Sequence, residues 1–381
     1  MLLFFTIFIT VYTAVNYYVF IRGWQAISSL PVLKPFYLPI FIIVAYGYIL
    51  AKLLYKFLPP LAYDILLVVG AIWFAYLVYF ILILLGIDLL RLLDSFIHFF
   101  PSLFNKNYEL TKKITTVVII AVVSIVIFLG NLNKREITIK RLELNLPKGD
   151  GKLNELNIVM AADLHLSPID GEKLLSRIVE KINSLEPDII LFAGDIVDDK
   201  AKVLMRSEIG ESFKQLNPKY GIYAINGNHE FINDVESSVK FMQDYNFHVL
   251  RDNHEFVDSS FYIIGREDVS MKQFTGSQRK ALNEIVKPVE ENYPKIMLDH
   301  TPVKLEQAEK NGIDLQLSGH THHGQIWPGN IITNLIYEIS WGYKKKDKTH
   351  YYVTSGAGTW GPPVRTGSKS EIVNIKVKFT N

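Results

Sequence analysis

Four long stretches without a charged residue occupy the first third of this chain, and they restrict its fold more than any other feature. These stretches are Leu2–Ile21, Pro35–Ala51, Ile65–Ile87 and Ile114–Leu132. A helix needs about 20 apolar residues to cross the hydrocarbon core of a bilayer. A cleaved signal peptide would account for the first stretch only. We therefore expect a transmembrane helical domain in residues 1–133, with four spans at about 2–21, 35–57, 65–87 and 114–132.

Residues 88–104, between the third and fourth spans, have a different pattern. Asp88, Arg91, Asp94, Ser95 and His98 recur at steps of three or four among Leu, Ile and Phe. This spacing is typical of an amphipathic helix. The segment either lies in the membrane interface or extends the third span against its neighbours.

Four spans place the N-terminus and the remainder of the chain on the same side of the membrane. Basic residues on the opposite side are Arg22, Lys34, Arg91, Lys106, Lys112 and Lys113. Those close to the membrane on the side of the soluble part are Lys52, Lys56, Lys134 and Arg135. The positive-inside rule therefore favours a soluble part outside the cytoplasm.

From about Lys134 the pattern changes to that of a globular α/β domain. Short buried strands are expected at Leu156–Ala162, Asp188–Ala193, Gly221–Ile225, Phe261–Ile264, Lys295–Leu298, Leu315–Leu317 and Tyr351–Thr354. Helices are expected at Gly171–Leu185, Lys202–Leu216, Val235–Tyr245, Gln278–Glu291 and Val303–Asn311. Strands separated by helices indicate a layered α/β fold in residues 134–381.

Composition limits the chemistry available to this soluble part. After Glu136 the chain carries 30 Lys and Arg against 33 Asp and Glu, which gives no electrostatic basis for binding nucleic acid. The chain has no cysteine, so disulfides and thiolate metal sites are excluded. Any bound metal must therefore be held by oxygen and imidazole nitrogen.

Five short motifs rich in Asp, His and Asn follow the expected strands. They are Asp163-Leu164-His165, Gly194-Asp195-Ile196-Val197-Asp198, Gly227-Asn228-His229-Glu230, Asp299-His300-Thr301-Pro302 and Gly319-His320-Thr321-His322. Each alone is weak, since a strand-end Asp or Asn is usually a turn former or a helix cap, and Asp198 and Glu230 fit that role. Ligand sites form at the ends of strands in open α/β sheets, and five motifs in this order favour one site.

The residue types suit a pair of divalent cations. Such a pair holds a phosphate and activates a water, and it needs a carboxylate able to bridge the two ions. Asp-x-His and His-x-His place alternate side chains of an extended segment on one side. Gly194, Gly227 and Gly319 allow the backbone to turn and to approach the ions closely. The remaining histidines, His98, His248, His254 and His350, have no partner at ligand spacing.

This set of motifs resembles the pattern of the calcineurin-like metallophosphoesterases, DxH, GDxxD, GNH[DE], H and GHxH, over about residues 155–375. The resemblance implies a four-layer sandwich of two mixed β-sheets flanked by helices. It also implies two divalent metal ions, Mn, Fe, Zn or Co, with Asp195 as the bridging ligand. One ion would be held by Asp163, His165, Asp195 and His322, and the other by Asp195, Asn228, His300 and His320. His229 would contact the phosphate and protonate the leaving group.

A finer likeness is to the bacterial membrane-associated or exported phosphoesterases, which often continue as GHTHGGQ and carry a later GTWGPPxR segment. Here the first segment reads Thr321-His322-His323-Gly324-Gln325, with His323 where glycine is common. The second runs from Gly358 to Arg365. His323, Trp360 and Arg365 are candidate substrate contacts. A packing role for Trp360 and a surface ion pair for Arg365 are the alternatives.

The resemblance implies hydrolysis of phosphomonoesters or phosphodiesters by a metal-bridging hydroxide, with Asp195, Asn228 and His229 as catalytic residues, in a multi-pass protein of a bacterial plasma membrane. An anchor needs only one helix, so four spans favour a lipid or lipid-linked substrate and membrane lipids as partners. A catalytically silent membrane sensor or scaffold that binds phosphate groups through the metal site is the alternative. A transporter would carry charged or glycine-broken residues within its spans, and the four stretches contain no charge.

Overall fold

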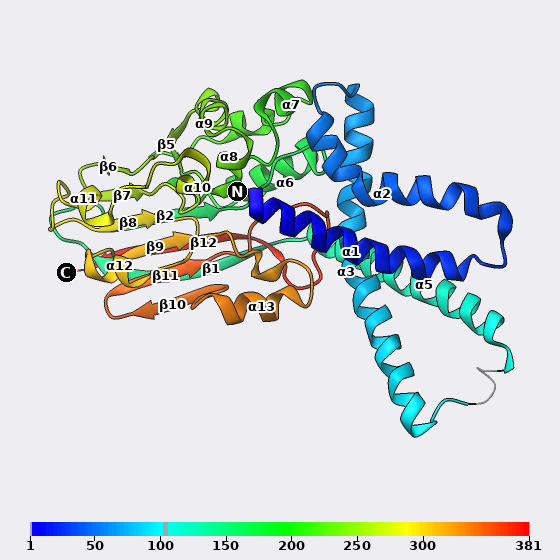
Figure 1. The fold of residues 1–381 in the computed structure, drawn as a ribbon. Helices are drawn as coiled ribbons and strands as arrows, with labels where there is room; N and C mark the ends of the chain where they lie inside the picture. Colours follow the sequence, from blue (N-terminus) through cyan, green and yellow to red (C-terminus); the bar gives the residue numbers. More distant parts are fainter. Residues whose placement is uncertain (1, 102–105, 381) are drawn as a thin grey trace. The chain divides into compact units, whose positions relative to one another are not determined.

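The computed structural model describes residues 2–101 and 106–380, and it divides into two compact units. One unit is helical and comprises Met1–Asn131 together with Gly361–Val364. The other comprises Leu132–Trp360 and Arg365–Asn381 and contains the strands (Figure 1). The chain therefore leaves the α/β unit briefly, between Trp360 and Arg365, and returns to it.

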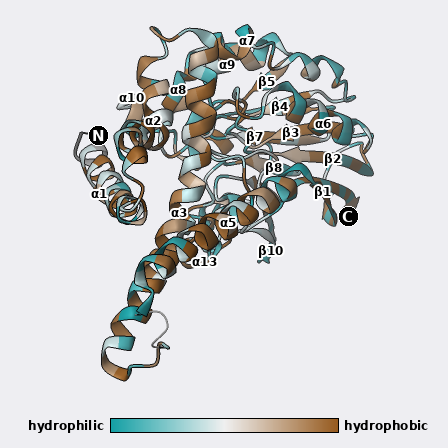
Figure 2. Ribbon diagram, turned by 90° about the vertical axis from the view of Figure 1, so that its right-hand side faces the viewer, coloured by the Kyte–Doolittle hydropathy of each residue, from teal (hydrophilic) through white to brown (hydrophobic). Residues whose placement is uncertain are grey.

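Long apolar helices make up the N-terminal region. They are α1 (Leu2–Ala26), η1 (Pro31–Leu33), α2 (Lys34–Leu54), α3 (Pro60–Ile97) and α5 (Tyr108–Arg135). Within the described residues, three segments are long and apolar enough to cross a membrane, namely Pro31–Leu54, Pro60–Ile97 and Tyr108–Arg135. Figure 2 shows the hydrophobic character of α3 and α5. These helices confirm the expected apolar helical region that precedes the α/β part.

The third span and the polar-patterned segment after it form one continuous helix, α3. Residues 88–97 extend this helix, which ends where His98 adopts a left-handed conformation (φ 53°). Residues 102–104 of the expected amphipathic segment lie outside the described residues. Asp88 forms an ion pair with Arg22 and accepts a hydrogen bond of 2.7 Å from the Tyr18 hydroxyl. This polar group of the segment therefore contacts a neighbouring helix of the same unit.

The α/β unit contains two mixed six-stranded sheets. The first has the order β1-β12-β2-β3-β4-β5, with bounds Ile137–Pro147, Ser370–Thr380, Glu155–Ala161, Ile189–Phe192, Ile222–Ala224 and Phe247–Val249. The second has the order β10-β11-β9-β8-β7-β6, with bounds Gly342–Lys346, Thr349–Val353, Leu315–Ser318, Lys295–Leu298, Phe261–Gly265 and Asn253–Val257. Strands β2 to β5 are mutually parallel, as are β7, β8, β9 and β11.

Helices cover the outer faces of both sheets, so the unit has four layers. The helices are α6 (Gly171–Asn183), α7 (Ala201–Arg206), η2 (Glu211–Gln215), α8 (Asn228–Asn233), α9 (Val235–Asp244), α10 (Met271–Thr275), α11 (Leu282–Val286), α12 (Glu306–Lys310), η3 (His322–Gly324) and α13 (Gly329–Ile336). Leu174 and Ile178 of α6 pack on one face of the first sheet, and Ile285 of α11 packs on the outer face of the second. Met160 and Leu298 belong to the core between the sheets. The four-layer sandwich is the fold class expected from the sequence.

Three expected helices are markedly shorter in the structure. The segment 202–216 is divided into α7 and η2, because Gly210 between them has φ 120° and Glu172 accepts hydrogen bonds from the backbone N–H groups of Gly210 and Ser212. The segment 278–291 contains only α11 (Leu282–Val286). The segment 303–311 contains only α12 (Glu306–Lys310), and Lys304 before it has φ 55°. All three expectations of a longer helix were wrong. In the segment 202–216 the side-chain acceptor of Glu172 and the positive φ of Gly210 compete with the helical backbone pattern.

The parallel strands point their carboxyl ends toward one edge of the unit. Asp163 follows β2, Asp195 follows β3 and Asn228 follows β4 in the first sheet. His300 follows β8 and His320 follows β9 in the second sheet. Since each strand ends within a few residues of its polar motif, the two sheets together deliver the motifs to a common region.

Candidate metal centre

The aspartate and histidine side chains of the motifs converge in three overlapping groups. They are Asp163, His165 and His322; His165, Asp195 and His229; and Asp195, His300 and His320. Within each group the ligand atoms lie within 4.8 Å of one another. The site thus unites residues that are up to 159 positions apart in the chain.

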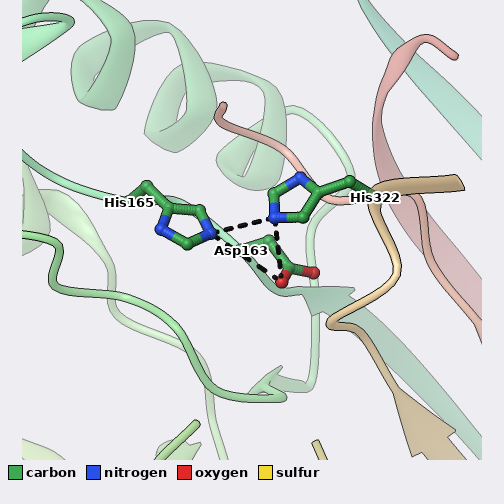
Figure 3. A group of neighbouring side chains, drawn as sticks. All are labelled: Asp163, His165 and His322. Carbon is green, nitrogen blue, oxygen red and sulfur yellow. Dashed lines mark hydrogen bonds and ion pairs between the residues drawn. The ribbon is translucent and has the colours of Figure 1, made fainter. Parts of the chain in front are cut away.

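Asp163, His165 and His322 face one another (Figure 3). His165 Nε2 lies 2.9 Å from His322 Nε2 and 4.0 Å from Asp163 Oδ1, and His322 Nε2 lies 3.5 Å from the same oxygen. Donors that share an ion about 2.1 Å away are separated by roughly 3–4 Å. The spacing and the N and O donors fit a divalent cation among these three side chains.

The second group is arranged around Asp195. Its Oδ2 lies 3.1 Å from His300 Nε2 and 3.7 Å from His165 Nε2, so this carboxylate faces both groups of histidines. The Nδ1 atom of His300 lies 2.8 Å from the carbonyl oxygen of Ala193. Donation of the Nδ1 proton to that carbonyl leaves Nε2 with a lone pair for a metal.

Asn228 joins this group at the start of α8. Its Oδ1 lies 2.8 Å from His320 Nδ1, and His320 is close to His300 in an edge-on arrangement of the two rings. The donor set is therefore two carboxylates, one amide oxygen and imidazole nitrogens, which suits Mn, Fe, Zn or Co. The structure brings all seven expected metal ligands into one site.

Burial and neighbouring charges together shift the pKa values of the titrating groups of the centre. Burial disfavours the charged forms of Asp195 and His300. The attraction between the two opposite charges is larger than this effect, so the pKa of His300 is raised and the pKa of Asp195 is lowered. Burial lowers the pKa of His320 to about 4, and burial together with His165 and Arg365 lowers that of His322 well below its ordinary value. Neutral imidazoles are the form that binds a metal.

His229 lies next to the metal ligands but is supported by a different partner. Its Nδ1 lies 2.5 Å from Asp198 Oδ1, and its backbone N–H donates to Asp195 Oδ1 at 2.8 Å. Although burial lowers the pKa of His229, Asp195 and Asp198 raise it to about 9. This raised pKa favours the protonated form of His229, the form that a proton donor to a leaving group needs.

Asp198 and Glu230, interpreted from the sequence as turn formers or helix caps, both support the centre. Glu230 is also a cap, because its carboxylate accepts a hydrogen bond from the backbone N–H of Gly227 at the start of α8. Asp198 contacts His229, as described, and lies 3.7 Å from His165 Nδ1. The Glu230 carboxylate accepts hydrogen bonds from four backbone N–H groups, those of Asp195, Ile196, Val197 and Gly227. Both positions are acidic in the GDxxD and GNH[DE] patterns, which was the available signal.

The three candidate substrate contacts have different environments. Arg365 is completely buried and donates to the carbonyl oxygens of Ser355, Gly356 and Gly358, so the alternative of a surface ion pair is wrong. His323 is half-buried, with Nδ1 3.0 Å from Ser340 Oγ and its ring against Trp341. Trp360 is 54% exposed, and its ring centroid lies 6.0 Å from that of His229. Of the three, Trp360 is both accessible and next to the expected proton donor.

An α/β sandwich with an Asp/His/Asn centre at its strand ends defines a class of metal-dependent hydrolases, and comparison with known proteins specifies the family. The calcineurin-like phosphoesterase family matches residues 156–324. A metallophosphoesterase of Aquifex aeolicus is 33% identical over 235 residues, which is 61% of this chain and 87% of that protein. The chain belongs to the calcineurin-like metallophosphoesterase family and contains the domain of a metal-dependent phosphoesterase.

The family also contains membrane proteins. A Danio rerio protein named transmembrane protein with metallophosphoesterase domain is 33% identical over 252 residues, 62% of this chain and 56% of that protein. The chain thus spans about half the length of this relative. The three apolar helices of spanning length among its described residues and this relative both indicate a membrane protein. A solved dimetal phosphatase from Danio rerio is 11% identical, with a TM-score of 0.35, over 59% of this chain and 99% of that one.

Proposed function

We propose that this chain is a membrane-anchored phosphoesterase that uses two metal ions to hydrolyse a phosphomonoester or phosphodiester of a lipid or lipid-linked substrate. One observation carries the proposal, namely the position of the Asp195 carboxylate between two groups of histidines. Its Oδ2 lies 3.7 Å from His165 Nε2 on one side and 3.1 Å from His300 Nε2 on the other. A carboxylate that bridges two cations needs this placement.

The roles of the side chains follow from their positions. When bound, a pair of divalent ions supplies positive charge for phosphate oxygens and lowers the pKa of a bound water. Asp163, His165, Asp195 and His322 would hold one ion, and Asp195, Asn228, His300 and His320 the other. His229, held by Asp198, presents its proton to the departing oxygen. Trp360 is exposed beside His229 and restricts how the leaving-group portion of a substrate fits into the site.

The membrane helices support a lipid or lipid-linked substrate. One helix suffices to retain a protein at a membrane, and this chain has three apolar helices of spanning length within its described residues. We further propose a bacterial plasma membrane with the α/β unit outside the cytoplasm, because basic residues are more numerous in the opposite connecting segments. Labelling of single cysteines from either side of intact cells tests this orientation.

The test of the enzymatic function is hydrolysis by purified full-length protein of soluble chromogenic phosphomonoesters and phosphodiesters, and of phosphatidic acid and phosphatidylglycerol, with metals added back singly. Asn228→Ala and Asp195→Asn are expected to lower the rate by at least about 100-fold while the circular dichroism spectrum is retained. An Asn228→Ala protein as active as the wild type would refute the two-metal assignment. If the wild-type protein binds phosphate esters but hydrolyses none of them, the result would instead support the sensor alternative.

A further inference from the structure

Helix α13 (Gly329–Ile336) exposes a continuous apolar face. Ile331 and Leu335 lie one turn apart, as do Ile332 and Ile336, and all four side chains are exposed, Leu335 to 83%. Residues at this spacing form one face of a helix. A helix on the surface of a water-soluble protein normally presents polar side chains outward. Contiguous exposed apolar residues therefore mark a surface that binds a partner or a membrane.

The opposite side of α13 is attached to the α/β unit beside the metal centre. Thr333 Oγ1 accepts a hydrogen bond of 2.9 Å from the Ser340 hydroxyl, and Ser340 Oγ also lies 3.0 Å from His323 Nδ1. The ring of Tyr337, which follows the helix, lies edge-on to the ring of His320 with 6.0 Å between centroids. One side of α13 is thus held against the α/β unit next to a metal ligand, and the apolar side is exposed.

Aromatic and basic residues flank α13 in the chain. Trp327 before the helix and Trp341 and Tyr343 after it are exposed, and Lys140 lies over the Trp341 ring at 5.0 Å. The segment 338–348 carries four lysines, of which Lys344 and Lys346 pair with Glu338 and Lys346 also pairs with Glu309. Trp and Tyr are enriched where a protein meets the headgroup layer, and lysines beside an apolar face favour anionic lipid.

We propose that the apolar face of α13 docks on a bilayer surface containing anionic phospholipid and thereby holds the metal centre at the headgroup layer. Three observations select a lipid surface as the occupant: the exposed aromatic residues that flank α13, the lysine over Trp341, and the apolar helices of spanning length in the same chain. The docking is inferred from the surface residues alone. The further inference that the substrate is a headgroup phosphate rests on the proposed function.

The native chain has no cysteine, so a single introduced cysteine can report on the environment of α13. Leu335→Cys or Ile332→Cys, labelled with an environment-sensitive fluorophore, is examined in full-length protein in vesicles of equal parts phosphatidylcholine and phosphatidylglycerol. Met205→Cys on α7, 51% exposed and also apolar, is the matched control. We expect lipids with brominated acyl chains to quench the α13 labels at least several-fold more than the α7 label.

Equal quenching at α13 and α7 would overturn the proposal. Shielding of the α13 label that depends on protein concentration and not on brominated lipid would also overturn it, in favour of a second copy of the chain.

An activity measurement separates docking from substrate choice. Ile332→Glu combined with Leu335→Glu is expected to lower hydrolysis of vesicle phospholipid by about tenfold or more, since burying one leucine-sized side chain corresponds to about that factor in affinity. Hydrolysis of a soluble chromogenic ester should not change, and Met205→Glu should affect neither. Lipid quenching at α13 without any phospholipid hydrolysis would refute the lipid substrate and leave the docking intact. Phospholipid hydrolysis that the double variant does not reduce would refute the role of docking in catalysis.

Discussion

Five expected metal ligands and the adjacent His323 hold backbone conformations that residues other than glycine rarely adopt. Asp163, His165, Asp195, His320, His322 and His323 have φ values between 45° and 72°. Each such conformation costs of order 1–3 kcal/mol and persists only where surrounding contacts enforce it. Because these conformations are concentrated in one place, we infer that the loops direct donor atoms toward the centre at a cost in local stability.

Glycine is needed at 319 because of close approach. A Cβ atom at this position would lie 2.4 Å from Asp163 Oδ2. We predict that Gly319→Ala displaces the Asp163 carboxylate and lowers activity by about 100-fold, the effect of roughly a 1 Å misplacement. Metal content and chromogenic ester hydrolysis measure this. Gly312→Ala is the control, since Gly312 has φ 64° and open space, so it should lose stability and keep activity. Full activity in Gly319→Ala would disprove the steric argument.

The pairing of Asp198 with His229 leads to a kinetic prediction. Asp198→Asn removes the charge 2.5 Å from His229 Nδ1 and weakens the hold of His229 on its proton. Esters with alkyl leaving groups, which need protonation, should lose about 10²–10⁴-fold in rate. Esters of nitrophenol, a good leaving group, should lose far less. Measurement of kcat across leaving groups decides this, and an equal loss for all esters would assign Asp198 to metal binding or folding.

At the scale of elements, α8 secures the loop after β3 through a single side chain. Glu230, in the first turn of α8, accepts four backbone hydrogen bonds from Asp195, Ile196, Val197 and Gly227. Glu230→Ala should lower the free energy of unfolding by at least about 3 kcal/mol, because buried N–H groups lose their acceptor. Denaturant unfolding of the purified protein measures it. Glu284→Ala on α11, an exposed position, should change stability little, and a similar small effect at Glu230 would contradict the argument.

A histidine and a tyrosine on the neighbouring strands β10 and β11 lie within hydrogen-bond distance of each other. His350 Nδ1 lies 2.8 Å from the Tyr343 hydroxyl, and burial together with Lys345 lowers the pKa of His350 below its ordinary value of 6.5. The unfolded chain therefore binds the proton more readily, so stability falls as pH drops below about 6.5. We predict a smaller loss of stability between pH 7.5 and 5.5 in His350→Asn than in the wild type. Unfolding midpoints at both pH values test this, and identical losses would exclude His350 as a contributor.

Most interior strands of each sheet were predictable, whereas the edge strands were not. Strands β2, β3, β4, β7, β8, β9 and β11 correspond to apolar runs in the sequence. β1, β5, β6 and β10, which form the four sheet edges, were not expected, and neither was β12, which lies between β1 and β2. β12 alternates exposed Lys376 and Lys378 with buried Val377 and Phe379, and this alternation was an available signal of a strand.

For the whole molecule, metal is expected to couple folding to activity. The centre buries Asp163 and Asp195 together, and burial raises the pKa of Asp163 to about 6. An ion that binds only the folded unit stabilises it by about 2.7 kcal/mol at 100 times its dissociation constant. Chelation should abolish ester hydrolysis and lower the thermal midpoint of the α/β unit, and adding back Mn²⁺ or Zn²⁺ should restore both. An unchanged midpoint after verified loss of metal would contradict the coupling.

The sequence by itself determined the ligand types, their order along the chain and their position after buried strands, because these depend on local periodicity and short motifs. It also determined the apolar N-terminal helices, because lipid imposes a length that a run of residues displays directly. Only the tertiary structure decided the burial of Arg365, the support that Asp198 and Glu230 provide, and the exposure of α13. Each of these depends on which distant segment covers a side chain, and a side chain's own sequence neighbours do not specify that.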